Sequence, residues 1–189
     1  WVFWVLDLFE GLHTVVFGYF ALLFVAPLLQ KFIPGLSLFN PLSAGLVMGF
    51  AILPYVSNVA ADAMQSVPRS IREAAYALGA RPYEVALKVV LPAALSGVIA
   101  AIILAASRAI GETMIVAIAA GQRPTLTLDP RETIATMTSY IVQAATGDQP
   151  TGSTAYYALF AVGFTLFLLT LALNVLAQYI VERYRERYE

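Results

Sequence analysis

The stretch QPTGSTAYYALFAVGFTLFLLTLALNVLAQYIV, residues 149–181, decides the fold class. It contains 33 consecutive residues without an Asp, Glu, Lys or Arg. A helix needs about 20 apolar residues to cross the hydrocarbon core of a bilayer, and it bonds its own backbone N–H and C=O groups where water is absent. We therefore expect a transmembrane helix over Tyr156–Val181.

Three further uncharged stretches lie earlier in the chain, and they end before Lys31, Asp62 and Arg108. They hold 20, 30 and 19 residues, which is again the length that a bilayer requires. The corresponding spans are expected at Leu12–Leu29, Leu42–Val59 and Ala93–Ala120. The predicted fold class is all-α, a polytopic transmembrane helical bundle with about four spans.

The composition excludes several classes of protein. Of the 189 residues, 60% are hydrophobic and 12% charged, against about 25% charged in soluble domains. The 12 acidic and 11 basic residues give no net positive field, which argues against nucleic-acid binding. Cysteine is absent and His13 is the single histidine, so thiol catalysis, a metal centre and a Ser-His-Asp triad lack their residues. We expect no catalytic residue and no metal site, and His13 as an interfacial side chain.

Basic residues gather on one side of the predicted bundle. Seven of the 11 lie between spans two and three or after span four: Arg69, Arg72, Arg81, Lys88, Arg183, Arg185 and Arg187. Cytoplasmic loops carry an excess of Lys and Arg, so we expect this side and both ends of the fragment to be cytoplasmic. Because the chain opens at Trp1 without a methionine or a basic leader, we expect one transmembrane domain, 1–189, that is N-terminally incomplete.

The cytoplasmic connection, residues 66–92, contains strong helix signals. Ser70 followed by Glu73 predicts a capping box. We expect a short helix over Ile71–Leu78, ended by Gly79 in the left-handed conformation.

A second short helix is expected to follow directly. Pro82 suits the first helical position, and Leu91-Pro92 predicts a break before the third span. An ordinary solvated loop is the alternative, but two capped helices require more sequence specificity than a connector does.

The outer segment, residues 121–153, is expected to be periplasmic. Asp129, Pro130 and Glu132 form a helix start there, and apolar residues follow at helical spacing. We expect an amphipathic helix over Pro130–Thr146 that contacts the bundle with its apolar face.

Arg108 and Glu112 are the charged residues inside a predicted span, four residues apart and so on one face of a helix. An unpaired arginine at mid-membrane costs about 3 kcal/mol or more, so such residues normally face protein or water and mark a pathway. A buried ion pair that fixes helix packing is the alternative, and the residues alone leave both open.

Small residues predict where helices approach closely. Gly45 and Gly49 form a G-x-x-x-G pattern in span two, and Gly97, Ala101 and Ala105 step by four along span three. Such faces allow close backbone contact, so we expect helix packing at all five positions.

The stretch EAAYALGARPYEVALKVVLP, residues 73–92, resembles the EAA loop of the membrane subunits of ATP-binding-cassette importers. Its anchor positions are Glu73, Ala74, Ala75, Gly79, Leu91 and Pro92, and Val89 stands where isoleucine is usual. The resemblance implies that this loop docks into a groove of an ATP-hydrolysing subunit and couples that subunit to the spans.

A further resemblance covers nearly the whole chain. The stretches GLHTVVFGYFALLFVAPLL (11–29), LSAGLVMGFAILP (42–54), SRAIGETMIV (107–116) and AGQRPTLTL (120–128) are similar to the C-type permeases of phosphate-specific importers. His13 departs from the proline that is usual there. The resemblance implies a sister permease, an ATP-binding subunit homodimer and a periplasmic phosphate-binding protein, with ATP held by the partner and no cofactor in this chain.

The expected function is therefore import of inorganic phosphate across the bacterial inner membrane by alternating access, without enzymatic activity in this chain. Arg108, Glu112 and Thr113 are the expected pathway residues. A permease for another oxyanion, the sister phosphate permease, or an ion-coupled carrier or channel are the alternatives.

Overall fold

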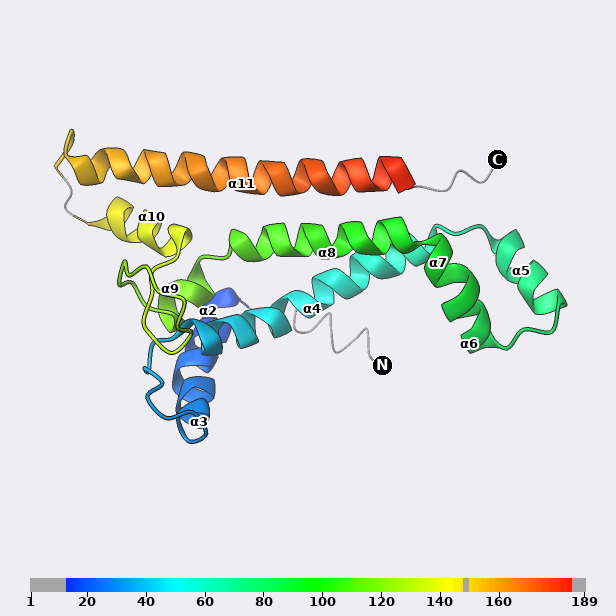
Figure 1. Cartoon of the computed structure of the whole chain (residues 1–189), viewed down its shortest axis with the longest axis horizontal. Helices are drawn as coiled ribbons and strands as arrows, with labels where there is room; N and C mark the ends of the chain where they lie inside the picture. Colours follow the sequence, from blue (N-terminus) through cyan, green and yellow to red (C-terminus); the bar gives the residue numbers. More distant parts are fainter. Residues whose placement is uncertain (1–12, 148–149, 185–189) are drawn as a thin grey trace. The chain divides into compact units, whose positions relative to one another are not determined.

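The computed structural model describes residues 13–147 and 150–184. Every regular element in these two ranges is a helix, which confirms the all-α fold class (Figure 1). The predicted start of span one at Leu12, and Arg185 and Arg187, lie outside the described residues. The helices are α2 (Thr14–Phe20), η1 (Ala21–Val25), α3 (Ala26–Gln30), α4 (Pro41–Gln65), α5 (Arg69–Ala77), α6 (Pro82–Glu84), η2 (Val85–Val90), α7 (Leu91–Ala93), α8 (Leu95–Ile110), α9 (Met114–Ala119), α10 (Met137–Thr146) and α11 (Thr154–Tyr184).

The chain divides into two compact units. Unit 1 comprises Trp1–Pro54 and Arg108–Thr170, and unit 2 comprises Tyr55–Ser107 and Leu171–Glu189. Each unit is therefore built from two separated stretches of sequence, and α4, α8 and α11 contribute residues to both.

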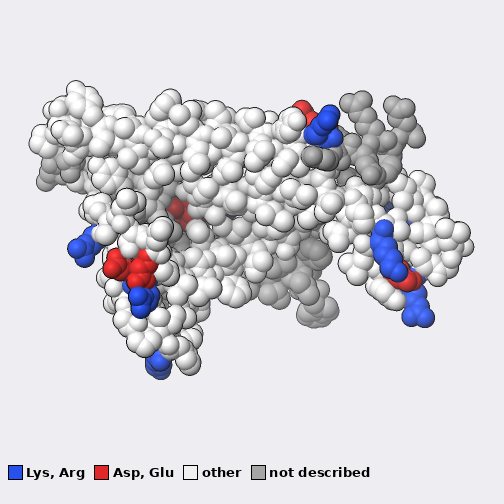
Figure 2. Space-filling model, in the orientation of Figure 1, with Lys and Arg blue, Asp and Glu red and all other residues white. Residues whose placement is uncertain are grey.

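Two helices of the described chain, α4 and α11, are long and apolar enough by themselves to cross a membrane. They contain the predicted spans two and four. The most apolar 18-residue window of α11 has no residue buried within the described structure. Figure 2 shows a molecular face on which the charged side chains are few and most of the surface is uncharged.

The prediction of one continuous third span over Ala93–Ala120 is wrong. The segment Pro82–Ala93 and α8 meet at a bend of 72° around Ala94, shortly after Pro92, which lacks the N–H that a regular helix requires. A second break follows at residues 111–113, before α9 begins. Counted as one bent span, the first two pieces give a third candidate crossing.

The described part of predicted span one is an apolar helix over Thr14–Gln30, which is shorter than the helices that count as candidate crossings. Its middle turn is the π-helix η1, which ends two residues before Pro27. The second π-helix, η2, likewise ends two residues before Pro92. A proline ring clashes with the carbonyl four residues earlier, so both π turns lie where the regular hydrogen-bond series is interrupted.

The core of unit 1 lies where α2 packs against α9. A Cβ placed on Gly18 would lie 3.0 Å from the Cδ1 of Ile118, so the glycine permits close approach of these helices. The buried residues of this core are Phe17, Ala21, Ala44, Val47, Ile115, Val116, Ala119 and Ala120.

Asn40 joins the start of α4 to this core. It is fully buried; its Oδ1 accepts a hydrogen bond of 2.7 Å from the Ser43 N–H, and its own N–H donates to the Ala119 carbonyl at 3.0 Å. The side chain therefore caps α4, while the backbone ties that helix start to the end of α9.

The predicted helix over Pro130–Thr146 is too long at its start, because α10 begins at Met137. The Asp129 carboxylate does not start a helix; instead it accepts hydrogen bonds from the backbone and side chain of Arg131. The true N-cap is Thr136, whose hydroxyl accepts from the Ser139 N–H at 3.2 Å while the Ser139 hydroxyl accepts from the Thr136 N–H.

Candidate coupling element and pathway residues

The first helix of the candidate coupling element, residues 66–92, is α5 in unit 2. It begins at Arg69 directly after Pro68, two residues before the predicted start, and no side chain of the described residues caps its first turn. The predicted Ser70–Glu73 capping box is therefore wrong, because both residues lie inside the helix. Its C-terminus agrees with the prediction: Gly79 has a φ of +83°, and its N–H donates to the Tyr76 carbonyl at 2.9 Å.

The second helix begins at Pro82, as the sequence predicts. The Arg81 N–H donates to the Glu84 Oε2 at 3.0 Å, and Lys88 forms an ion pair with Glu84 at 3.3 Å one turn later. This local capping fixes where the segment Pro82–Ala93 starts.

A small apolar cluster holds the two helices together. Val67, Val85, Val90 and Ala94 are buried in it. From α5, the partly buried Ile71 and Ala75 pack against the same cluster, so one face of α5 rests on the segment that leads to the bend at Ala94.

The outward side of the element is exposed and apolar. We name Tyr76, Leu78, Tyr83 and Leu87 the coupling surface; all four are exposed, and Leu78 is 90% exposed. A short element that exposes four large apolar side chains is a candidate for interaction with another protein.

The six anchor residues of the EAA pattern are distributed over this element. Glu73 and Ala74 are exposed on α5, Ala75 packs inward, and Gly79 forms the turn. The remaining two, Leu91 and Pro92, lie in α7, directly before the bend. The pattern thus runs from the exposed helix to the point where α8 begins.

The three predicted pathway residues lie around the second break, in unit 1. Arg108 is in the last turn of α8, and Glu112 follows the end of that helix at Ile110. The expectation that Arg108 and Glu112 share one helix face is therefore wrong. The Glu112 Oε1 accepts hydrogen bonds from the N–H groups of Met114 at 3.1 Å and Ile115 at 3.4 Å, so this carboxylate caps α9.

Other contacts support the same break. The Thr113 hydroxyl donates to the Gly111 carbonyl at 3.3 Å. The Thr138 hydroxyl, on α10, donates to the Glu112 carbonyl at 2.9 Å. The break thus combines a carboxylate, hydroxyl groups and non-helical backbone, next to an arginine, within an otherwise apolar segment.

The predicted small-residue faces differ in their surroundings. A Cβ on Gly97 would lie 2.6 Å from the Cβ of Ala63, which shows close approach of α8 and α4 within unit 2. Ala101 and Ala105 are buried. Gly45 and Gly49 are exposed, and no atom of the described chain would lie within 4 Å of a Cβ on either.

Residues 1–186 match the family described as binding-protein-dependent transport system inner membrane component. The chain belongs to this family. No solved structure matches it.

Three relatives show which members of this family the chain is similar to. It is 31% identical over 179 residues to the probable ABC transporter permease protein YqgH of Bacillus subtilis (95% of this chain, 58% of the relative). It is 30% identical to the phosphate transport system permease protein PstC of Xylella fastidiosa strain 9a5c (94% of this chain, 60% of the relative), and 30% identical to the probable PstC of Methanocaldococcus jannaschii (95% and 62%). The chain thus spans about 60% of the length of these relatives.

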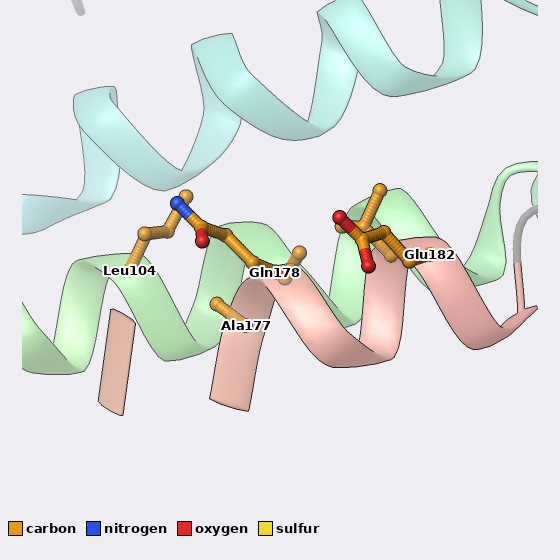
Figure 3. A pocket seen from close by; sticks show the side chains of 6 residues that line it. Leu104, Ala177, Gln178 and Glu182 are labelled. Atoms are coloured by element: carbon orange, nitrogen blue, oxygen red, sulfur yellow. The ribbon is translucent and has the colours of Figure 1, made fainter. Parts of the chain in front are cut away.

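Unit 2 of this inner membrane component also contains a hollow of about 350 Å³ between α8 and α11. Figure 3 shows Gln178 and Glu182, one turn apart on α11, with their polar ends on the same side. The lining residues are Ala100, Leu104, Ala177, Gln178, Val181 and Glu182. None of the three predicted pathway residues lines this hollow. Sequence reasoning did not find it.

Sequence reasoning also missed a contact of Arg72, which it treated only as one of the basic residues of the cytoplasmic connection. Its Nη2 donates a hydrogen bond of 2.6 Å to the Met64 carbonyl, eight residues earlier and near the end of α4. The two residues lie on different helices, so no single helical period indicates the contact.

Proposed function

We propose that the chain is the C-type permease subunit of an ATP-driven phosphate importer in the bacterial inner membrane. The observation that carries the proposal is the element over Glu73–Pro92, which bears the EAA pattern on two short helices and exposes the coupling surface. An ion-coupled carrier or a channel has no need of such an element. The names of the PstC relatives support phosphate as the substrate.

In this proposal an ATP-hydrolysing homodimer binds the coupling surface. When it closes on ATP it pushes α5, which rests on the apolar cluster of the segment Pro82–Ala93. That segment continues through the bend at Ala94 into α8. The movement is thereby transmitted to the spans, which open alternately to the outside and to the cytoplasm.

The remaining partners follow from the same proposal. A sister permease completes the pathway, and a periplasmic binding protein delivers phosphate to the outer side. Seven of the 11 basic residues belong by sequence to the connection between predicted spans two and three or to the stretch after span four. This distribution supports a cytoplasmic location for both of these segments and for both chain ends.

The substrate pathway is proposed at Arg108, Glu112 and Thr113. Arg108 offers a positive charge to a phosphate ion in surroundings where charge-assisted hydrogen bonds are stronger than in water. Glu112 keeps a negative charge nearby, which prevents phosphate from binding too tightly to be released.

Transport is tested in proteoliposomes that contain the complete permease with this chain, its sister permease and the ATPase, supplied with the binding protein. We expect ATP-dependent uptake of radiolabelled phosphate that excess sulfate or molybdate does not reduce. Preferential uptake of sulfate or molybdate identifies another oxyanion as the substrate. Uptake that continues without the ATPase subunit identifies a carrier or channel.

Coupling is tested with single cysteines, since the chain has none of its own. We expect Leu78→Cys to crosslink to the ATPase subunit. Leu126→Cys is the matched control, because Leu126 is also a fully exposed leucine but lies in the predicted outer segment. Equal crosslinking of the two variants argues against the proposed docking.

The pathway assignment has its own test. We expect Arg108→Ala to lose phosphate uptake and Arg108→Lys to retain part of it in an assembled transporter. Full uptake by both variants shows that Arg108 serves packing instead.

A further inference from the structure

Two contacts within unit 2 hold the last turn of α4. In the first, the Nη2 of Arg72, on α5, donates to the Met64 carbonyl at 2.6 Å. In the second, Gly97 of α8 lies so close to Ala63 that a Cβ on the glycine would come within 2.6 Å of the alanine Cβ. One helix turn thus contacts both the coupling helix and the span that follows it.

The chemistry of the Arg72 contact suits a helix end. The last carbonyls of an α-helix have no partner within the helix, and they form the negative end of its dipole. Ser66 satisfies one of them, because its hydroxyl donates to the Ala63 carbonyl at 2.7 Å. The next one, the Met64 carbonyl, accepts from the Val67 N–H at 3.3 Å and receives in addition a shorter, charge-assisted hydrogen bond from the Arg72 guanidinium.

The Arg72 side chain is also confined. The residue is half-buried, and its Nε is buried without a hydrogen-bond partner among the described residues. Burying an unbonded N–H costs free energy, so the Met64 contact compensates for a position that is otherwise unfavourable. The other contacts of α5 with its neighbours in the cluster are apolar, and such contacts do not fix one direction of movement as a hydrogen bond does.

We infer that Arg72 is a positioning residue for energy coupling: it ties α5 to the end of α4, so that a displacement of α5 moves α4, and through Gly97 also α8. This inference rests on the proposed function, in which a partner displaces α5. Without the hydrogen bond between Arg72 and Met64, α5 can move relative to its apolar cluster. A smaller part of the displacement of α5 is then transmitted to α4 and α8.

The principal test measures phosphate transported per ATP hydrolysed in the reconstituted complex. Arg72→Gln shortens the side chain so that it no longer reaches the Met64 carbonyl. Loss of one hydrogen bond to a charged group disfavours the bonded arrangement of α4 and α5 by about tenfold, and we expect the ratio to fall severalfold. Arg72→Lys keeps a charged donor, and we expect its ratio to lie between those of the glutamine variant and the wild type. Arg69→Gln is the matched control, because Arg69 starts the same helix but is exposed, and we expect an unchanged ratio.

A second measurement does not depend on transport. Spin labels on Gln65→Cys and Ala77→Cys, both exposed residues of unit 2, report the distance between the ends of α4 and α5. We expect one narrow distance distribution with Arg72 and a broader one with Arg72→Gln. Absence of ATP-driven uptake in the wild type contradicts the proposed function, whereas this measurement still tests the tie.

Equal transport ratios in the Arg72→Gln and Arg69→Gln complexes overturn the coupling role. If the glutamine variant does not assemble, Arg72→Met fills the half-buried site without a donor, and the same fall in ratio is expected. If both neutral variants fail to assemble while Arg72→Lys assembles with a wild-type ratio, Arg72 serves folding only and the inference is wrong.

Discussion

The hydroxyl of Thr138 donates a hydrogen bond of 2.9 Å to the backbone carbonyl of Glu112, 26 positions earlier in the chain. This contact joins α10 to the break between α8 and α9. Thr138 is buried, so water does not readily replace the hydroxyl if it is removed. Helix α10 therefore supports the backbone that carries the proposed pathway residue Glu112.

Thr138→Val removes this donor and keeps the shape of the side chain. It leaves the Glu112 carbonyl without its Thr138 donor, and we expect a destabilisation of about 1–3 kcal/mol, measured as a lower thermal unfolding midpoint of the purified permease. Thr146→Val is the control, because Thr146 is exposed and its hydroxyl donates within its own helix. A similar loss for both variants contradicts the special role of Thr138.

Glu112 combines a capping role with a charge, and two variants separate them. Glu112→Gln keeps an oxygen that can accept from the N–H groups of Met114 and Ile115, whereas Glu112→Ala removes it. We expect the alanine variant to lose about 1 kcal/mol of stability and the glutamine variant to lose little. If the charge matters for release of phosphate, the glutamine variant binds phosphate more tightly and transports it more slowly. Uptake rates equal to wild type in the glutamine variant leave Glu112 with capping alone.

Gly97→Ala tests the close approach of α4 and α8. The added Cβ would meet the Ala63 Cβ at 2.6 Å, so the helices must separate, and we expect a cost of about 1–3 kcal/mol. Gly45→Ala is the matched control, since its Cβ enters open space within this chain and alanine favours a helix by about 1 kcal/mol. Thermal unfolding of the isolated permease measures both variants, and equal midpoints contradict the packing at Gly97.

The contact between Asp129 and Arg131 predicts that the stability of the folded protein depends on this pair only at acidic pH. Hydrogen bonds from the Arg131 side chain, and then from its backbone N–H, lower the pKa of Asp129 from its ordinary value of 3.8 to about 2. Because the pKa is lower in the folded state, the stabilisation is complete above pH 3.8 and is lost as the pH falls from there towards 2. Carbon NMR of the Asp129 carboxyl group measures the midpoint, which we expect to return towards 3.8 in Arg131→Gln. A wild-type midpoint near 3.8 contradicts the pairing.

The sequence predicts the parts of the fold that depend on local chemistry. The uncharged stretches locate α4 and α11, because length and apolarity alone determine whether a helix suits a bilayer. The turn at Gly79 and the helix start at Pro82 were also predictable, since the backbone requirements of these two residues hold without any tertiary contact.

The errors arose where side chains bond the backbone in competition with a helix. The Glu112 carboxylate starts a new helix inside a long apolar run, and Asp129 bonds Arg131 in place of a first helical turn. The spacing of apolar residues along the sequence indicates neither of these two contacts. Arg72 was missed for another reason: its contact with Met64 depends on where α5 lies against α4, which is a tertiary property.

Helix α11 has 31 residues, which corresponds to about 46 Å at 1.5 Å per residue. The hydrocarbon core of a bilayer is about 30 Å thick. The helix is longer than this thickness by roughly a third of the helix length. A helix with such a mismatch tilts or projects beyond the acyl chains into the headgroup layer. Glu182 and Arg183 stand at its final turns, where their charges can reach water and lipid headgroups and set the depth at which the helix is anchored.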